Sequence, residues 1–271
     1  MICEFQQYEY YQQVVSNYRD NFGLIVQEGK DGGDAAHRIG TFYFGMYLIF
    51  KDNKVILKKV KKDFEKELSK IKVDKGVYVR HPDKTKWYSN PRNFSRDQTF
   101  PIVLALGVFD EKEELIANLD NLVKSGSFYP NDLKNWSNEQ KKLPSDYNDL
   151  AFIGDYGNYI RSLKRYEFYP YLMFSDLTLV VSSIIRVGFS YFDKTDTSDD
   201  LNMSLNLLQA EEFMPTPSSY LAKWIYTTFK ARNFDNDLPI ISAWNYYYRK
   251  EGGAPPMNKV YDCLLRKNFY D

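Results

Sequence analysis

Residues 35–50 read AAHRIGTFYFGMYLIF, a nearly all-apolar stretch with helical spacing. A helix that is apolar on all sides has to be buried, so we expect this segment at the centre of the fold. A second apolar segment at 96–109 is expected to form another central helix. The spacing Ser95-x-x-Gln98 predicts a capping box at its start, in which the two side chains satisfy free backbone N–H groups. Pro101 inside this helix predicts a kink or a freed carbonyl.

Helical periodicity continues along almost the whole chain. Further helices are expected at 4–19, 54–71, 111–125, 149–164, 172–188, 199–212, 217–231, 238–250 and 257–268. Long polar loops are expected at 74–94 and 127–148, and residues 77–79 predict a short β segment without a sheet. The sequence therefore predicts one all-α domain over residues 1–271, built of paired helices as an α/α toroid or as an irregular helical array.

Charge and cysteine content restrict the class of protein. The 271 residues include 36 basic and 36 acidic side chains, so no global field attracts nucleic acid or an anionic membrane. Cys3 and Cys263 lie near opposite ends and have neither disulfide-framework nor metal-binding spacing, so we expect no cofactor and no metal. The N-terminus has no pattern of a signal peptide, which predicts a soluble cytoplasmic protein and leaves non-classical export as an alternative.

Titratable residues of both signs gather at the start of the 35–50 helix. Asp34 stands immediately before the helix, where it can act as a cap or as a carboxylate partner in catalysis. His37 and Arg38 follow in the first turn, next to small residues that allow a ligand to approach closely. An imidazole titrates near neutral pH, so we predict that His37 is a general acid or base. Arg38 is predicted to bind substrate.

The 74–94 loop carries a second group of candidates. Arg80 and His81 are predicted to bind polar groups of a ligand, and Trp87 and Tyr88 to form a stacking wall for a saccharide. The same aromatic residues are also typical anchors of a well-packed long loop. Both interpretations stay open at the level of sequence.

Arg96 and Asp97 open the second central helix. A carboxylate suits a helix N-terminus, so Asp97 is either a simple helix-end charge or a catalytic carboxylate. A cation is disfavoured there, so Arg96 predicts a nearby carboxylate or an anionic ligand. We therefore expect the two central helices to lie side by side with their N-termini at the same end. One pocket at that end is expected to be lined by Arg38, Arg80, His81, Arg96 and Asp97.

These observations favour a hydrolase or lyase that acts on a small polar ligand, such as a saccharide. Helix pairing and loop-borne polar residues are similar to those of toroidal carbohydrate-active enzymes. One alternative is a non-enzymatic helical interaction protein with a buried Arg-Asp-His structural network. Another is a metal-dependent hydrolase in which Asp31 and Asp34 hold a divalent metal ion with His37 and His81. Asp155 and Asp176 are interpreted as helix caps.

Overall fold

The structure is mostly α-helical, as the sequence predicts. The computed structural model describes residues 8–9, 11–12, 15–16, 19–25, 34–85, 89–91, 94, 96–125, 149–190 and 197–230, and this part is 76% helical. Its elements, in chain order, are α2 Ala35–Phe50, α3 Lys54–Ile71, β1 Lys72–Asp74, β2 Val77–Tyr78, α4 Arg96–Val108, α5 Lys112–Ser125, α6 Asp149–Ser162, a 3-10 turn at Tyr166–Phe168, α7 Tyr169–Ser190, α8 Thr197–Glu212 and α9 Pro217–Lys230.

The helix bounds agree closely with those predicted from periodicity. The bounds of α2 and α3 are those expected, and the others differ by three residues or fewer at either end. The described residues within 4–19 include helical positions at 8–9, 11–12 and 15–16. The helices expected at 238–250 and 257–268 lie outside the described residues, as does the loop at 127–148.

One local prediction is wrong. The segment 77–79 was expected to stay isolated, but Val77–Tyr78 pairs with Lys72–Asp74 as an antiparallel two-stranded sheet. Gly76 makes the tight turn between the strands with φ 67°. This turn after β1 folds the chain back on itself, which the helical periodicity of α3 does not reveal.

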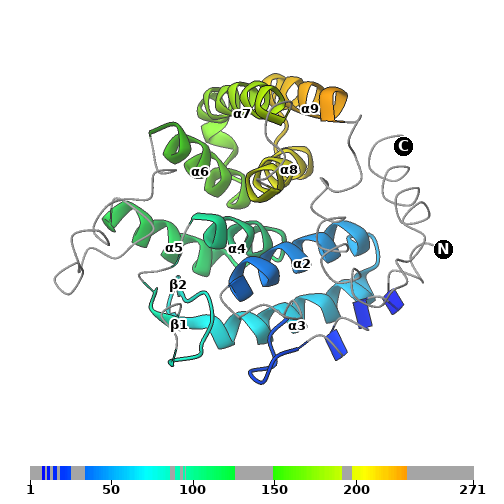
Figure 1. Ribbon diagram of the computed structural model, residues 1–271, viewed down its shortest axis with the longest axis vertical. Coiled ribbons are helices and arrows are strands. Elements are labelled where there is room, and N and C mark those ends of the chain that lie inside the picture. The colour runs from blue at the N-terminus through cyan, green and yellow to red at the C-terminus, as the bar shows by residue number, and fades with distance from the viewer. Residues whose placement is uncertain are drawn as a thin grey trace.

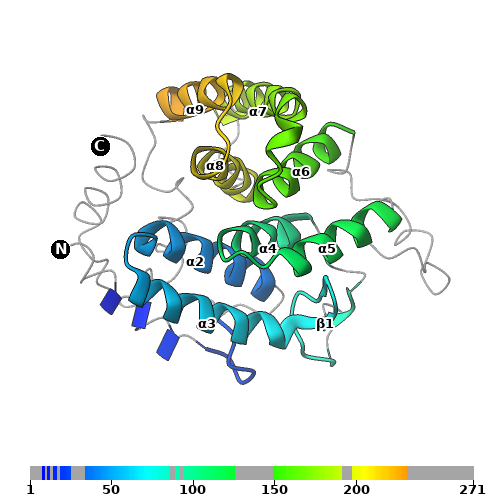
Figure 2. The same cartoon turned by 180° about the vertical axis from the view of Figure 1, so that it is seen from behind.

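The helices form two tiers, which Figures 1 and 2 show from opposite sides. One tier holds α2, α3, α4, α5 and the small sheet, and the other holds α6, α7, α8 and α9. α4 joins the tiers because it packs against α2 on one side and against α6 and α8 on the other. α7 and α9 lie side by side at the outer edge of the second tier.

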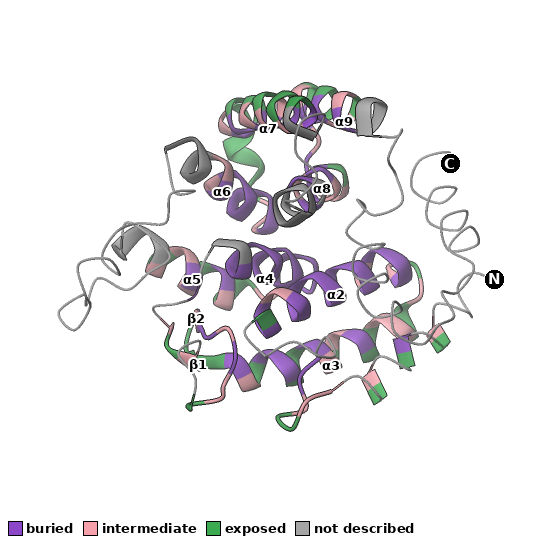
Figure 3. Ribbon diagram, in the orientation of Figure 1, coloured by how far each residue is buried: buried purple, intermediate pink, exposed green. Residues whose placement is uncertain are grey.

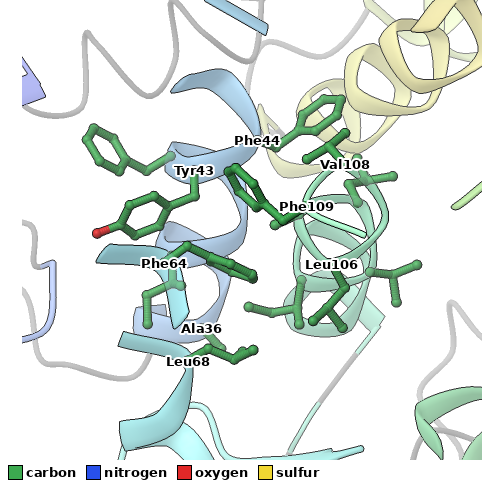
Figure 4. Close-up of a cluster of buried hydrophobic side chains, with 14 of the residues drawn as sticks. Ala36, Tyr43, Phe44, Phe64, Leu68, Leu106, Val108 and Phe109 are labelled. Atoms are coloured by element: carbon green, nitrogen blue, oxygen red, sulfur yellow. The ribbon is translucent and has the colours of Figure 1, made fainter. Parts of the chain in front are cut away.

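The main core lies between α2, α3 and α4 (Figure 4). Phe64 of α3 stacks on Phe109 just after α4 with ring centroids 5.1 Å apart, and Tyr43 of α2 lies 5.6 Å from Phe64. α3 buries one face and exposes its lysines, and the Asn53 side chain caps it by accepting a hydrogen bond from the Ile56 N–H at 3.2 Å. The central position predicted for residues 35–50 is confirmed, since nearly all of α2 is buried.

α2 and α4 run parallel in direct contact. Three pairs record this register: His37 with Gln98, Gly40 with Pro101, and Tyr47 with Phe109. A Cβ on Gly40 would lie 2.3 Å from the Pro101 carbonyl carbon, so only glycine permits this approach. The predicted pairing of the two central helices, with N-termini at the same end, is therefore confirmed. α4 remains helical through Pro101.

Candidate functional site

The N-terminus of α2 is capped by tertiary contacts. The Ala36 N–H donates to the carbonyl of Arg80 at 3.1 Å, and the His37 N–H donates to Oε1 of Gln98 at 3.0 Å. The first N–H groups of a helix lack intrahelical acceptors, so these two contacts fix the 74–94 segment and α4 against this end of α2. Gln98 is fully buried here. Sequence reasoning gave it a role only within its own helix and missed this one.

Asp34, Arg80 and Gln98 meet beside that helix end. Oδ1 of Asp34 accepts a hydrogen bond from Nε2 of Gln98 at 3.1 Å and lies 3.5 Å from a guanidinium nitrogen of Arg80. The Asp34 side chain is 52% exposed, whereas that of Arg80 is 16% exposed. Asp34 occupies the N-cap position without a side-chain cap bond, so its predicted capping role is wrong. Gln98 satisfies His37 instead.

His37 and Arg38 differ in accessibility. His37 is half-buried next to Asp34, and Arg38 is 4% exposed. Both terminal nitrogens of its guanidinium are buried. The two residues predicted together as catalyst and binder therefore occupy different environments.

The His81 side chain is buried, contacts the protein through both ring nitrogens and packs against another aromatic ring. Its Nε2 lies 2.5 Å from Oδ2 of Asp20, and its Nδ1 accepts a hydrogen bond from the Asp83 N–H at 3.1 Å. Because Nδ1 accepts, the proton sits on Nε2 and points to Asp20. The rings of Phe22 and His81 pack nearly at right angles with their centroids 5.0 Å apart, and His81 is 3% exposed. This residue clamps the turn at 19–25 to the 80–83 segment.

Asp20 is the anionic half of that clamp. Burial alone would raise the pKa of its carboxyl, but hydrogen bonds from His81, Leu24 and Phe22 outweigh burial and lower the pKa. The carboxylate therefore stays charged and accepts all three bonds at neutral pH.

A second buried charge anchors the same N-terminal segment. Glu67 of α3 accepts a hydrogen bond from Arg19 at 2.7 Å, one from the Ile25 N–H at 3.2 Å, and one from the Tyr43 hydroxyl. Burial raises the pKa of Glu67, and Arg19 and Tyr43 oppose it only in part. These contacts tie residues 19–25 to α2 and α3.

The remaining predicted site residues have no described side chains. Trp87 and Tyr88 lie outside the described residues, and Arg96 and Asp97 begin α4 with only their backbone described. The structure thus brings Asp34 and Arg80 together, joins them through Gln98 to the backbone of His37, and buries Arg38 and His81. The expected common pocket stays a prediction.

The deepest ion pair lies in the other tier. Arg161 of α6 contacts Asp176 of α7 at 2.5 Å, and the two side chains are 1% and 0% exposed. Nε of Arg161 donates to the carbonyl of Met214 at 3.2 Å, and the Thr216 hydroxyl donates to Asp176. The pair joins α6, α7 and the segment before α9. A buried charge without its partner is strongly unfavourable, so the two helices have to pack with these two side chains facing each other.

The interpretation of Asp155 and Asp176 as helix caps is wrong. Both lie inside helices, and both are at most 3% exposed. A buried amide extends this polar layer, since Nε2 of Gln209 donates to the Ser162 hydroxyl at 2.7 Å and to the Asn158 carbonyl at 3.0 Å. The signal available in the sequence was an aspartate inside an otherwise apolar helix.

The outer face of α7 and α9 is apolar, and Figure 3 shows exposed residues along it. We define the outer face by twelve large side chains with 37–64% exposure: Tyr166, Phe168, Tyr169, Met173, Phe174, Leu177, Val181, Ile184, Ile185, Tyr220, Leu221 and Trp224. Within residues 169–188, where exposure is described throughout, the other exposed residues are Pro170 and Gly188. This length of α7 has two charged residues: Asp176 is buried and Arg186 is half-buried.

Among the described residues, one segment, Tyr166–Gly188, has the length and apolarity of a membrane-crossing helix. Its inner side carries Ser175, Asp176 and Ser183, and these polar residues are buried against the protein. Asp176 binds Arg161 and Thr216 there. A helix held by these contacts presents only its other side to the surroundings.

In the part of the chain that the structure describes, no group of three His, Cys, Asp or Glu side chains is arranged to hold a metal ion. Asp31, which the metal-dependent alternative also uses, lies outside that part. This alternative stays a prediction. Comparisons with known protein families, curated proteins and solved structures find no match for the chain.

Proposed function

We propose that this chain is a helical interaction protein that binds another protein through the outer face of α7 and α9. One observation carries the proposal: along residues 169–188, every exposed position is apolar or aromatic. The largest apolar patch of an ordinary monomer covers about 300–600 Å². A whole aromatic side chain has a surface of about 150–250 Å². Twelve large side chains that are about half exposed therefore give the outer face an exposed apolar area on the order of 1,000 Å². Such a surface is unfavourable in water unless a partner covers it.

The buried charges support a structural role for the polar residues. Arg161 with Asp176, His81 with Asp20, and Arg19 with Glu67 each connect separate elements and have little contact with solvent. These are three separate pairs rather than one network, and their structural roles support the non-enzymatic alternative. The charged residues then hold a scaffold together, and the apolar outer face makes the contact.

Photo-crosslinking tests this function. A benzophenone amino acid replaces Phe174 in one sample and Trp224 in another, because these side chains are 54% and 60% exposed on α7 and α9. Illumination in living cells should yield the same protein adduct from both positions, identified by mass spectrometry. Leu177→Glu in the same chains should abolish it.

Val55 supplies the matched control, because this single apolar residue is 82% exposed on the lysine-rich α3. The same label at Val55 should give no such adduct. The absence of a protein adduct at both outer-face positions, or equal labelling at position 55, refutes the proposed function.

A second candidate function is favoured by the meeting of Asp34, His37 and Arg80 at the N-termini of α2 and α4. There, His37 would act as general acid or base on a small polar or carbohydrate-like ligand, with Asp34 or Asp97 as the carboxylate. The paired helices would belong to an α/α toroid. His37→Ala and Asp97→Asn, made separately, should each lower turnover in a hydrolase and lyase screen. Full activity in both variants excludes this candidate.

A further inference from the structure

α7 exposes a seam with the spacing of a coiled coil. Phe174, Leu177, Val181, Ile184 and Gly188 follow one another at intervals of three, four, three and four residues, and all are exposed. We propose that a second copy of this chain docks here, α7 against α7, about a two-fold axis. This inference rests on the proposed function and names the partner of the outer face.

The spacing selects a helix as the partner. Alternating intervals of three and four residues keep apolar side chains on one line along a helix, where each inserts between four residues of a facing helix. An irregular loop has no matching periodicity. Around Gly188 nothing lies within 4 Å of an added Cβ, so the end of the seam is open to a close approach.

None of the five seam positions is charged, and the nearby Arg186 is half-buried, which favours a second copy over an unrelated chain. In a two-fold interface the same patch is used by both subunits, and residues near the axis face their own copies. A charged residue there would face a like charge. A seam made only of apolar residues avoids this repulsion and is complementary to itself.

The size of the outer face fits a stable dimer. A standard interface buries about 800 Å² on each partner, and interfaces between permanent subunits are more apolar than others. The outer face exposes apolar area on the order of 1,000 Å² per chain, by the same side-chain areas as above. Tyr220, Leu221 and Trp224 extend the seam sideways, since α9 lies beside α7.

The charges around the outer face do not favour a membrane. Helices that lie on anionic membranes carry an excess of unpaired lysine and arginine beside their apolar side. Here Lys164 lies 3.6 Å from Asp110, Arg165 pairs with Glu167, and Lys223 lies 2.5 Å from Glu211. Carboxylates of the same chain therefore neutralise these three flanking cations.

Sedimentation equilibrium of the purified full chain tests the proposal. Over a wide range of concentrations the wild type should have twice the 32.0 kDa mass of one chain. Leu177→Glu and Ile184→Glu should each weaken self-association by about a hundredfold or more, because a carboxylate would be buried without a partner. Val55→Glu on α3 should remain dimeric. Circular dichroism of every variant should match the wild type, since residues 177 and 184 are half-exposed.

Fluorescence of the single described tryptophan of the outer face gives a second readout. Trp224→Phe should still form the dimer. Subtracting its emission spectrum from that of the wild type isolates the emission of Trp224, which should shift to the red as the wild type is diluted and the dimer dissociates. Leu177→Glu should show the red-shifted emission at every concentration. Both results follow only if dimer contact covers Trp224.

Three outcomes overturn the dimer. A wild-type mass of one chain, together with an adduct of a different protein from position 174, refutes the second copy and leaves the interaction function standing. A mass of one chain without any adduct refutes both. Binding of neutral phosphatidylcholine vesicles that Leu177→Glu abolishes, with a monomeric wild type, assigns the outer face to a lipid surface instead.

Discussion

Arg161 of α6 and Asp176 of α7 lie 2.5 Å apart at a place where neither side chain reaches solvent. The pair forms a salt bridge across the contact between the two helices. The pair fixes which faces of α6 and α7 meet. It therefore also determines which face of α7 is left outside, and this links the polar interior to the apolar outer face.

Removing one charge of this pair should be strongly destabilising. Asp176→Ala leaves the Arg161 guanidinium buried without its carboxylate, and we expect the free energy of unfolding to fall by about 3–5 kcal/mol. Urea denaturation measures the change. Replacing both residues together, Arg161→Met with Asp176→Leu, should recover most of the loss. Glu113→Ala is the control, because its ion pair with Lys75 is 86% exposed on the glutamate side and should contribute less than about 1 kcal/mol.

Gly40→Ala should separate the two central helices. The added methyl group would lie 2.3 Å from the backbone of Pro101, so α2 and α4 must move apart at a cost of about 1–3 kcal/mol. The matched control is Gly154→Ala on α6, where the nearest atom outside the helix is 3.6 Å away. That variant should gain up to about 1 kcal/mol from helix propensity. Thermal unfolding that ranks the two variants in the opposite order contradicts the proposed close contact.

Gln98→Met should uncap α2 while keeping the shape of the side chain. The partly buried His37 N–H loses its acceptor, and stability should fall by about 1–3 kcal/mol. Hydrogen exchange of the His37 amide should accelerate more than that of amides in the middle of α2. Gln12→Met on the exposed side of the N-terminal segment should change neither quantity. Unchanged exchange at His37 would show that Gln98 is not its cap.

Stability should decrease in acid through Glu114. Burial would raise the pKa of Glu114, but bonds from Lys72, the Gly76 N–H and Tyr78 outweigh burial and lower it. A carboxyl whose pKa is lowered in the folded state stabilises the fold fully at pH values above its ordinary pKa of about 4.5. This stabilisation is lost as the pH falls through the lowered pKa of the folded state.

Glu114→Gln should therefore be less stable than the wild type at neutral pH by about 1–2 kcal/mol, and the two curves should converge in acid. Urea midpoints measured from pH 7 downward test this. Glu113→Gln, at the exposed neighbour of Glu114, should follow the wild-type curve. A difference between Glu114→Gln and wild type that is constant with pH contradicts the titration argument.

The positions of the helices followed from the sequence because helical periodicity is a local property. Apolar residues that repeat every three or four positions have one stable backbone arrangement in water, and this gave the bounds of α2 and α3. The burial of residues 35–50 followed as well, since a helix apolar on all sides has to be covered. The parallel contact of α2 with α4 was inferred from their shared apolar character and polar first turns.

Side-chain partners were decided by the tertiary structure. Gln98 caps α2 and His81 binds Asp20 because the fold brings together segments that are distant in sequence. Asp155 and Asp176 appeared to be caps because sequence records their type and neighbours but not the direction in which each points from its helix. The apolar sequence of α7 likewise indicates burial, and only the packing of α6, α8 and α9 shows which side is covered. Periodicity determines where a helix forms along the chain. The rotation of that helix about its axis, and therefore the face that it buries, depends on the packing of all neighbouring helices.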